Sequence, residues 1–306
     1  MLEQSRPTPP AFTPPTSAQR ALLPTDQDVV FYREHGYYVS PVILSDQEIA
    51  AAIDGSERFY AGQVVDPGIE ELDRFRPTGT VPEGLRKNDY ASFFCPELAA
   101  LTRQPLLGAI AGRLTGSPSI RLWHDQLLYK PTDKPEKRAR VGWHTDRQYW
   151  MSCSSDDMLT AWIPFHDCDE EMGTITFVDG SHRWTEQSTG LNFFGHDLEE
   201  IEKGFASGGR PVVKTPIIFR QGQVSFHNCR TIHGSGPNLR VEPRRAIAVH
   251  LQDEANHHRV YLREDGQPAR HANDSLCRTV DGEPDYADPR ICPLLFQRDT
   301  TASSGR

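Results

Sequence analysis

The chain has 306 residues, of which 37% are hydrophobic and 25% are charged. This length suffices for one large domain or two small ones, and a single domain of this size buries a sizeable core. The 33 lysines and arginines are outnumbered by 42 aspartates and glutamates, which gives a formal net charge of −9. Because this balance provides no broad basic surface for phosphates, we expect a soluble enzyme with no nucleic-acid partner.

The cysteines are scattered, with no C-x-x-C pair and no density typical of a disulfide framework. They are Cys95, Cys153, Cys168, Cys229, Cys277 and Cys292. The N-terminus lacks the basic start and apolar stretch of a signal peptide, and no apolar run approaches the roughly 18 residues of a membrane span. These features predict reduced thiols in a cytoplasmic protein without membrane association, and they leave the oligomeric state open.

Both ends of the chain have a composition typical of disorder. Prolines recur through residues 1–24 among small and polar residues, and such a segment cannot bury enough apolar surface to order itself. Residues 297–306 have the same character on a smaller scale. We therefore predict a disordered proline-rich leader over 1–24, one folded domain over 25–296 and a flexible tail over 297–306.

Helices are predicted in the first part of the folded domain. One spans about residues 26–34 and is stopped by Gly36. A second follows Ser45, which forms a capping box with Glu48, three residues later. A third is predicted over residues 96–114, where leucines recur at mostly helical spacing.

Short strand-like segments separated by turn residues dominate the rest of the chain. The predicted strands cover residues 37–43, 120–130, 142–144, 158–164, 174–178, 223–232 and 246–251. Many short strands after an early helical segment, without regular alternation of strand and helix, favour an antiparallel barrel or sandwich. The predicted fold class is therefore mainly β with flanking helices.

Three residues form a pattern that indicates a metal site. His144 and Asp146 make an H-x-D motif, and at strand spacing two side chains two residues apart point to the same face. Much later in the chain, His233 precedes Gly234 and Gly236, and glycines let the backbone approach closely. Two imidazoles and one carboxylate form the facial triad of non-haem iron(II), which leaves coordination positions open for reactants. An isolated H-x-D motif is more often an ordinary surface or core pair.

Arg244, eleven residues after His233, strengthens the prediction of a metal site. A fixed cation behind a metal suits a dicarboxylate, because guanidinium binds a carboxylate through two parallel charge-assisted hydrogen bonds. The alternative is an exposed arginine in a salt bridge at a strand edge.

These motifs resemble the phytanoyl-CoA dioxygenase (PhyH) family of iron(II)- and 2-oxoglutarate-dependent oxygenases. The H-x-D pair, the segment 233–238 (HGSGPN) and Arg244 have the order and spacing of that family. The run 173–182 (GTITFVDGSH) resembles the family's strand and turn, although Asp179 stands where the family has proline. The resemblance extends over residues 28–251 and implies a double-stranded β-helix, a cupin-like jelly roll, with iron at one mouth.

Carried over to this sequence, the resemblance implies that iron is bound by His144, Asp146 and His233. It also implies that Arg244 and Ser235 hold the distal carboxylate of 2-oxoglutarate. In this family 2-oxoglutarate is converted to succinate and CO₂ while dioxygen oxidises a substrate. Halogenating relatives replace the aspartate with a small residue, so an aspartate here favours hydroxylation and leaves desaturation, epoxidation and cyclisation open.

Further residues are expected around the cosubstrate and the substrate. Those that match cosubstrate-contacting positions of the family are Gln126, Trp162 and Lys87. Those that follow the H-x-D motif and suit a small polar substrate at the entrance are Arg147, Tyr149 and Trp150. The alternatives are an ordinary core tryptophan at position 162 and a hydrophobic cover over the barrel at position 150. The acidic charge and the aromatic entrance favour a small polar metabolite over an acyl-CoA.

Structural roles are predicted for other histidines. His227 shares strand parity with His233 but lacks the following Gly-Ser and the spacing to Arg244, so a structural role is predicted for it. His124 is predicted to be a structural histidine with satisfied hydrogen bonds.

One alternative function is a metal-binding jelly roll without oxygenase activity. Another is a zinc hydrolase, which would need a positioned acid or base and no Arg244.

Overall fold

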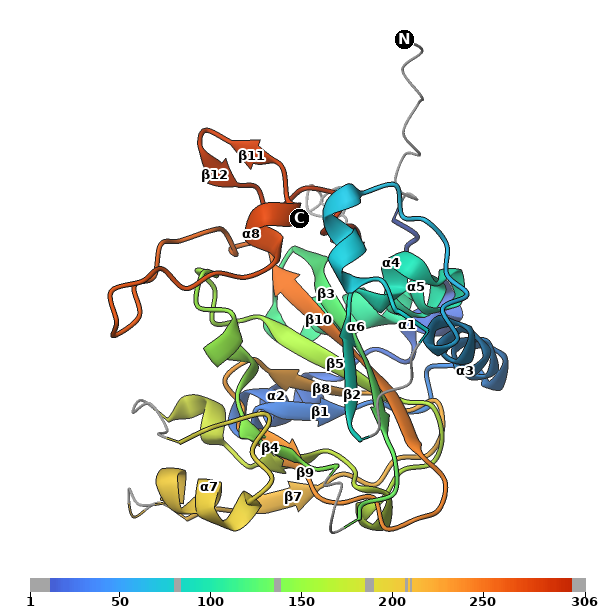
Figure 1. The fold of residues 1–306 in the computed structure, drawn as a ribbon, viewed down its shortest axis with the longest axis vertical. Coiled ribbons are helices and arrows are strands. Elements are labelled where there is room, and N and C mark those ends of the chain that lie inside the picture. Colours follow the sequence, from blue (N-terminus) through green and yellow to red (C-terminus); the bar gives the residue numbers. More distant parts are fainter. Residues whose placement is uncertain are drawn as a thin grey trace.

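The computed structural model describes residues 12–79, 84–134, 139–184, 190–206, 209 and 211–298. Two antiparallel sheets form its centre, and helices gather on one side of the larger sheet (Figure 1). In order, the strands of the larger sheet are β1 (Tyr37–Val39), β8 (Ser225–Asn228), β5 (Leu159–Pro164), β10 (Arg244–Asp253), β3 (Ser119–Lys130) and β13 (Leu294–Gln297). Strand β2 (Arg86–Asp89) also pairs with β3.

The smaller sheet lies below the larger one in Figure 1. Its strands, in order, are β4 (Val141–His144), β9 (His233–Ser235), β6 (Thr176–Val178) and β7 (Lys214–Pro216). From β3 to β10 the chain alternates between the sheets except at the consecutive pair β6 and β7, because β3, β5, β8 and β10 belong to the larger one and β4, β6, β7 and β9 to the smaller one. This alternation is a double-stranded β-helix, which confirms the predicted jelly roll. A separate hairpin joins β11 (Thr279–Val280) and β12 (Glu283–Pro284).

The helices begin and end largely where the sequence indicates. The α-helices are α1 (Ser17–Arg20), α2 (Asp26–His35), α3 (Asp46–Tyr60), α4 (Ala91–Phe94), α5 (Pro96–Thr102), α6 (Pro105–Thr115), α7 (Leu198–Ala206) and α8 (Asn273–Leu276). Short 3₁₀ turns are η1 (Glu70–Phe75), η2 (Asp146–Tyr149), η3 (Glu170–Met172) and η4 (Ser181–Arg183). Gly36 ends α2 in a left-handed conformation with φ of 83°, and Ser45 and Glu48 form the predicted capping box of α3.

The single helix predicted over residues 96–114 is wrong, because the structure has two helices there. Helix α5 ends at Thr102, and α6 begins at Pro105. Proline has no backbone N–H and its ring crowds the preceding turn, so it begins a helix more readily than it continues one.

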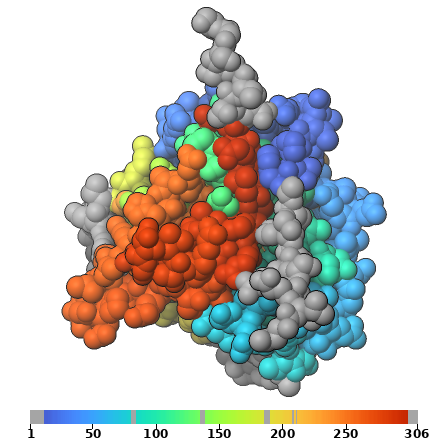
Figure 2. Space-filling model, turned by 90° about the horizontal axis from the view of Figure 1, so that it is seen from above, coloured from blue at the N-terminus to red at the C-terminus, as the bar shows by residue number. Residues whose placement is uncertain are grey.

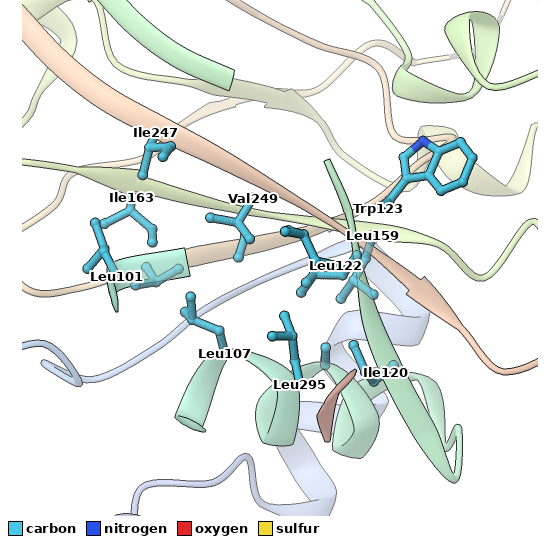
Figure 3. Close-up of a cluster of buried hydrophobic side chains, with 14 of the residues drawn as sticks. Leu101, Leu107, Ile120, Leu122, Trp123, Leu159, Ile163, Ile247, Val249 and Leu295 are labelled. Carbon is cyan, nitrogen blue, oxygen red and sulfur yellow. The ribbon is translucent and has the colours of Figure 1, made fainter. Parts of the chain in front are cut away.

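The core lies between the larger sheet and helices α5 and α6. Side chains on the outer face of the strands, among them Ile163, Ile247 and Val249, meet Leu101 and Leu107 of the helices (Figure 3). These five side chains are at most 2% exposed. Alternate side chains of a strand point to opposite faces, so the packing of these apolar residues leaves the other face of the same strands free to carry polar groups.

Part of the predicted leader is ordered in the structure. Helix α1 has a capping box at Thr16, and Leu22 and Leu23 pack against the core. The carbonyl of Pro24 accepts a hydrogen bond from Nε of Arg113 at 3.2 Å. The predicted domain boundaries stay a prediction, and residues 1–11 and 299–306 lie outside the described residues. No helix in the described part of the chain is long and apolar enough to span a membrane.

Replacement of Leu107 tests the position of the core. Leu107 is fully buried, so Leu107→Ala should lower the free energy of unfolding by about 2–5 kcal/mol, through lost apolar burial and the cavity that remains. Urea denaturation measures this change. The control is Val30→Ala at a position that is 50% exposed, for which a change within about 0.5 kcal/mol is expected. Equal effects of the two substitutions would contradict this description of the core.

Candidate active site

The two predicted histidine ligands come from paired strands of the smaller sheet. His144 ends β4 and His233 begins β9, and the two residues are direct partners in the ladder. Their ring centroids lie 4.1 Å apart. One ligand atom from each of His144, Asp146 and His233 lies within 4.8 Å of the others, and all three residues are buried. The structure therefore brings the sequence-predicted triad together.

Asp146 reaches the site by a different local structure from the one expected. Strand β4 stops at His144, and Asp146 is the first residue of the 3₁₀ turn η2. The predicted strand spacing of His144 and Asp146 is therefore wrong, because the carboxylate reaches the site from a 3₁₀ turn. Two side chains of the larger sheet orient the Asp146 carboxylate: Thr160 donates a hydrogen bond at 2.6 Å, and Nε2 of His227 lies 3.2 Å away. His227 thus has the supporting role that its sequence context predicts.

Hydrogen bonds also orient the two imidazoles. Nδ1 of His144 lies 2.8 Å from the carbonyl oxygen of Gly142, and Nδ1 of His233 lies 3.0 Å from that of Thr231. A carbonyl only accepts, so each Nδ1 carries the hydrogen and each Nε2 keeps a lone pair for a metal. Burial lowers the pKa of His144 and lowers that of His233 well below its usual range, which keeps both rings neutral.

The carboxylate of Asp146 is held in its charged form. Burial acts to raise its pKa, but the hydrogen bond from His227 and the neighbouring imidazoles outweigh burial and hold the pKa well below its usual range. Two neutral imidazoles and one carboxylate with two oriented hydrogen-bond donors are the donor set that suits non-haem iron(II). The residues present therefore fit an iron(II) ion.

Arg244 lies at the closed end of the cavity that also contains the triad. Its side chain is fully buried over the ring of Trp162, with 5.3 Å from the guanidinium carbon to the ring centroid. Nη1 donates to the carbonyl of Gly173 at 2.8 Å and lies 3.4 Å from Oγ of Ser235, whereas Nε has no partner among the described residues. The alternative of an exposed strand-edge salt bridge is therefore wrong.

Lys130 is a second buried cation in this region, and the sequence analysis missed it. It is the direct neighbour of Arg244 across the β3–β10 ladder and is fully buried. Nζ donates to the carbonyl of Gly236 at 2.7 Å and to the hydroxyl of Ser235. A lysine at a strand end suggests an exposed side chain, but Lys130 shares strand parity with Gln126, which would have placed it on the inner face.

The two cations have no carboxylate partner within the described residues. Burial, and then the positive charge of Arg244, holds the pKa of Lys130 well below its usual range, and burial lowers the pKa of Arg244 to about 10. Because an uncompensated buried charge is costly, this end of the cavity suits an anionic ligand. A dicarboxylate with its distal group here would reach back toward the triad.

A narrow inner cavity connects the triad with Arg244. Its lining includes Gln126, Trp162, Ser235, Arg244 and the three residues of the triad. Gln126 and Trp162 face each other across Ala248 in the ladder. The predicted cosubstrate positions 126, 162, 235 and 244 therefore share one cavity. Lys87 does not line it, and its Nζ pairs with Asp89 at 2.9 Å.

An outer cavity of about 300 Å³ opens on the other side of His144 and Asp146. Its roof comes from η1, from β2 and from residues 270–272. Figure 2 shows the orange-to-red C-terminal segment spread over the upper face beside the cyan segment that precedes β2, and Nη2 of Arg74 donates to Ser275 at 3.2 Å. Two segments distant in sequence therefore close the cavity together.

The predicted substrate residues separate in the structure. Trp150, only 2% exposed, and Tyr149 both line the outer cavity, as does Lys87. Arg147 lines a different cavity. Its guanidinium donates to the carboxylate of Asp156 at 2.8 Å and to the carbonyl of Cys153 at 3.0 Å. Arg147 also donates to the backbone carbonyl of Trp150, so it supports the loop that carries Trp150 but does not line the outer cavity.

A double-stranded β-helix with two histidines and an aspartate at one mouth and a buried arginine behind them defines a class of enzymes, the non-haem iron and 2-oxoglutarate oxygenases. Comparison with known proteins agrees with this class. The family model described as phytanoyl-CoA dioxygenase (PhyH) matches residues 32–246. The chain belongs to the PhyH family and is an iron(II)- and 2-oxoglutarate-dependent dioxygenase.

Individual relatives are distant. The chain is 25% identical to the peroxisomal phytanoyl-CoA dioxygenase of Bos taurus over 238 residues, which cover 74% of this chain and 68% of the relative. It is 26% identical to the ectoine dioxygenase of Bordetella bronchiseptica, with 72% and 73% covered. The crystal structure of SnoK, a non-heme alpha ketoglutarate dependent carbocyclase from nogalamycin biosynthesis, is similar with a TM-score of 0.65 and 26% identity over 93% of this chain and 100% of that one.

The hydrogen bond from Thr160 to Asp146 yields a prediction for metal binding. Thr160→Val keeps the shape of the side chain and removes the donor, so the affinity for iron(II) should fall about 10- to 100-fold. Anaerobic titration against a chromophoric chelator measures this affinity. Thr102→Val is the matched control, because Thr102 is equally buried but bonds only to the carbonyl of Ala99 in α5. Equal affinities in wild type and Thr160→Val would refute the supporting role of Thr160.

The buried His124 predicts a dependence of stability on pH. Burial, and then the neighbouring His250 and His271, holds the pKa of His124 well below its usual range. The unfolded chain takes up a proton near pH 6.5 while the folded protein does not, so the free energy of unfolding falls as pH decreases below about 6.5. His124→Phe removes this contribution.

Urea denaturation at pH 6.5 and pH 5.0 tests the prediction for His124. The loss of stability between these values should be smaller in His124→Phe than in wild type, by up to about 1.4 kcal/mol per pH unit. At pH 8, where histidine is neutral in both states, the two proteins should show the same slope. An unchanged slope between pH 6.5 and 5.0 would contradict the assignment of a neutral buried ring.

Proposed function

We propose that the protein hydroxylates a small organic molecule, with iron(II) bound by His144, Asp146 and His233 and with 2-oxoglutarate and dioxygen as co-reactants. The observation that carries this proposal is a single cavity with the triad at one end and the buried Arg244 at the other. Bound iron(II) supplies the redox chemistry that couples decarboxylation of 2-oxoglutarate to oxidation of the substrate. The protein's own residues bind and orient the reactants.

Arg244 and Ser235 receive the distal carboxylate of 2-oxoglutarate. The hydroxyl of Ser235 accepts hydrogen bonds from Lys130 and Arg244, so its single hydrogen remains available for the carboxylate. Lys130 is thus a positioning residue for Ser235, and it adds positive charge to the closed end of the cavity. Gln126 and Trp162 form the walls beside the cosubstrate.

The substrate binds in the outer cavity, against Trp150 and Tyr149. The volume of about 300 Å³ lies at the lower end of the range for small-molecule sites, which favours a compact metabolite over an acyl-CoA. The carboxylate of Asp146 favours hydroxylation over halogenation. Cyclisation is the second candidate reaction, because one structure that is similar over almost the whole chain is that of a carbocyclase.

A cytoplasmic location is part of the proposal. All six cysteines are buried free thiols, which suits a reducing compartment. A metal-binding jelly roll without oxygenase activity remains the alternative, and it gives no reason for two buried cations behind the triad.

Anaerobic spectroscopy with iron(II) tests the proposed function. Addition of 2-oxoglutarate to the wild-type protein should produce a visible charge-transfer band, because the cosubstrate binds the metal through two oxygens. Arg244→Ala should require at least about tenfold more 2-oxoglutarate for the same band, since it loses charge-assisted hydrogen bonds to a carboxylate.

Arg245→Ala is the matched control. Arg245 is the next residue of β10, points to the opposite face and pairs with Glu57 at 3.0 Å. This variant should bind 2-oxoglutarate as the wild type does. Absence of a band in wild-type protein that has bound iron would sink the oxygenase proposal and favour the alternative of a binding protein.

A further inference from the structure

Three imidazoles form a polar wall of the outer cavity. They are His124 on β3, His250 on β10 and His271 just before α8. His124 and His250 are partners in the β3–β10 ladder, with ring centroids 4.3 Å apart, and the ring of His271 lies 4.9 Å from that of His124.

Two of these rings have nitrogen atoms without a hydrogen-bond partner among the described residues. His124 and His250 are each 3% exposed, and both nitrogens of His124 and Nε2 of His250 are unpartnered within the part of the chain that the structure describes. This corrects the prediction of a satisfied structural role for His124. Buried polar atoms are rarely left without a partner in a folded protein, so these nitrogens point to a ligand that completes them.

The contacts of Thr160 determine which nitrogen of His250 carries the hydrogen. The hydroxyl of Thr160 has one hydrogen, which it donates to the Asp146 carboxylate at 2.6 Å. The same oxygen lies 2.7 Å from Nδ1 of His250 and must accept from it. A neutral imidazole has a single N–H, so Nε2 of His250 keeps its lone pair and is a hydrogen-bond acceptor on the cavity wall.

His271 has the opposite arrangement. Its Nδ1 accepts a hydrogen bond from the backbone N–H of Asn273 at 3.2 Å. The hydrogen of the neutral ring is therefore on Nε2. The wall thus offers an acceptor at His250 and a donor at His271, with the unpartnered His124 between them.

The remaining walls are mainly aromatic, and Arg270 adds a positive charge to them. Side chains that line the cavity include Phe75, Tyr90, Tyr149, Trp150 and Phe193. The charge of Lys87 at the entrance is compensated by Asp89, 2.9 Å away. Flat aromatic surfaces favour ring-shaped ligands.

We propose that the outer cavity binds a ring compound that carries a hydroxyl group, and that this hydroxyl donates a hydrogen bond to Nε2 of His250. Thr160 contacts both His250 and the metal-binding Asp146, so this acceptor lies beside the triad. The proposal rests on the proposed function, because the same cavity opens on His144 and Asp146.

Matched ring compounds test the proposal without knowledge of the natural substrate. The probes are 1-tetralol and its methyl ether, which differ in the hydroxyl hydrogen. Ligand-observed NMR titration measures both dissociation constants on the full chain loaded with zinc(II) and 2-oxoglutarate, since zinc(II) permits no turnover. The wild type should bind the alcohol about tenfold more tightly than the ether, the expected effect of one hydrogen bond.

Variants at position 250 give the decisive comparison. In His250→Phe the preference for the alcohol should fall to about one, whereas His250→Gln, which keeps an acceptor, should retain part of it. His166→Phe is the control, because His166 bonds only to the backbone of Asp167 and Arg245 outside the cavity. Equal binding of the two probes by the wild type, or an unchanged preference in folded His250→Phe, overturns the proposal.

The result of the probe titration can be distinguished from the result of the spectroscopic test of the proposed function. A charge-transfer band together with equal binding of the two probes would overturn the ring-alcohol site and leave the oxygenase intact. A preference for the alcohol that depends on His250, without any band, would leave the binding site and remove the oxygenase.

Discussion

The hydrogen bond between Thr160 and Asp146 connects the two sheets at the point where the chemistry is expected. Asp146 follows a strand of the smaller sheet, whereas Thr160 lies on the larger one, and the two atoms are 2.6 Å apart. The histidines of the triad belong to the smaller sheet alone, so this contact helps to hold the third ligand at a fixed place between the two sheets. A shift between the sheets would therefore move the carboxylate relative to the imidazoles, and with it the metal.

Much of this arrangement could be predicted from the sequence because it is local. His144 with Asp146, and His233 with Arg244, are close in sequence, and a capping box or a glycine marks a helix end through its nearest neighbours. What could not be predicted depends on distant contacts. Strand β2 has a polar sequence without alternation and is a strand only because β3 offers it a partner.

The directions of some side chains also could not be predicted from the sequence. The chain enters the 3₁₀ turn η2 shortly after His144. The side chain of Arg147 therefore turns away from the outer cavity and binds backbone carbonyls. Lys130 ends strand β3, and its burial depends on the loop after β9, which contacts its ammonium group. Both errors arise where a strand ends, because the alternation of faces no longer decides the direction of a side chain there.

The uncompensated charges of Lys130 and Arg244 also affect the folded state as a whole. A ligand that binds only the native protein shifts the unfolding equilibrium in its favour by mass action, and here such a ligand would also relieve two buried cations. Saturation with 2-oxoglutarate would therefore raise the free energy of unfolding.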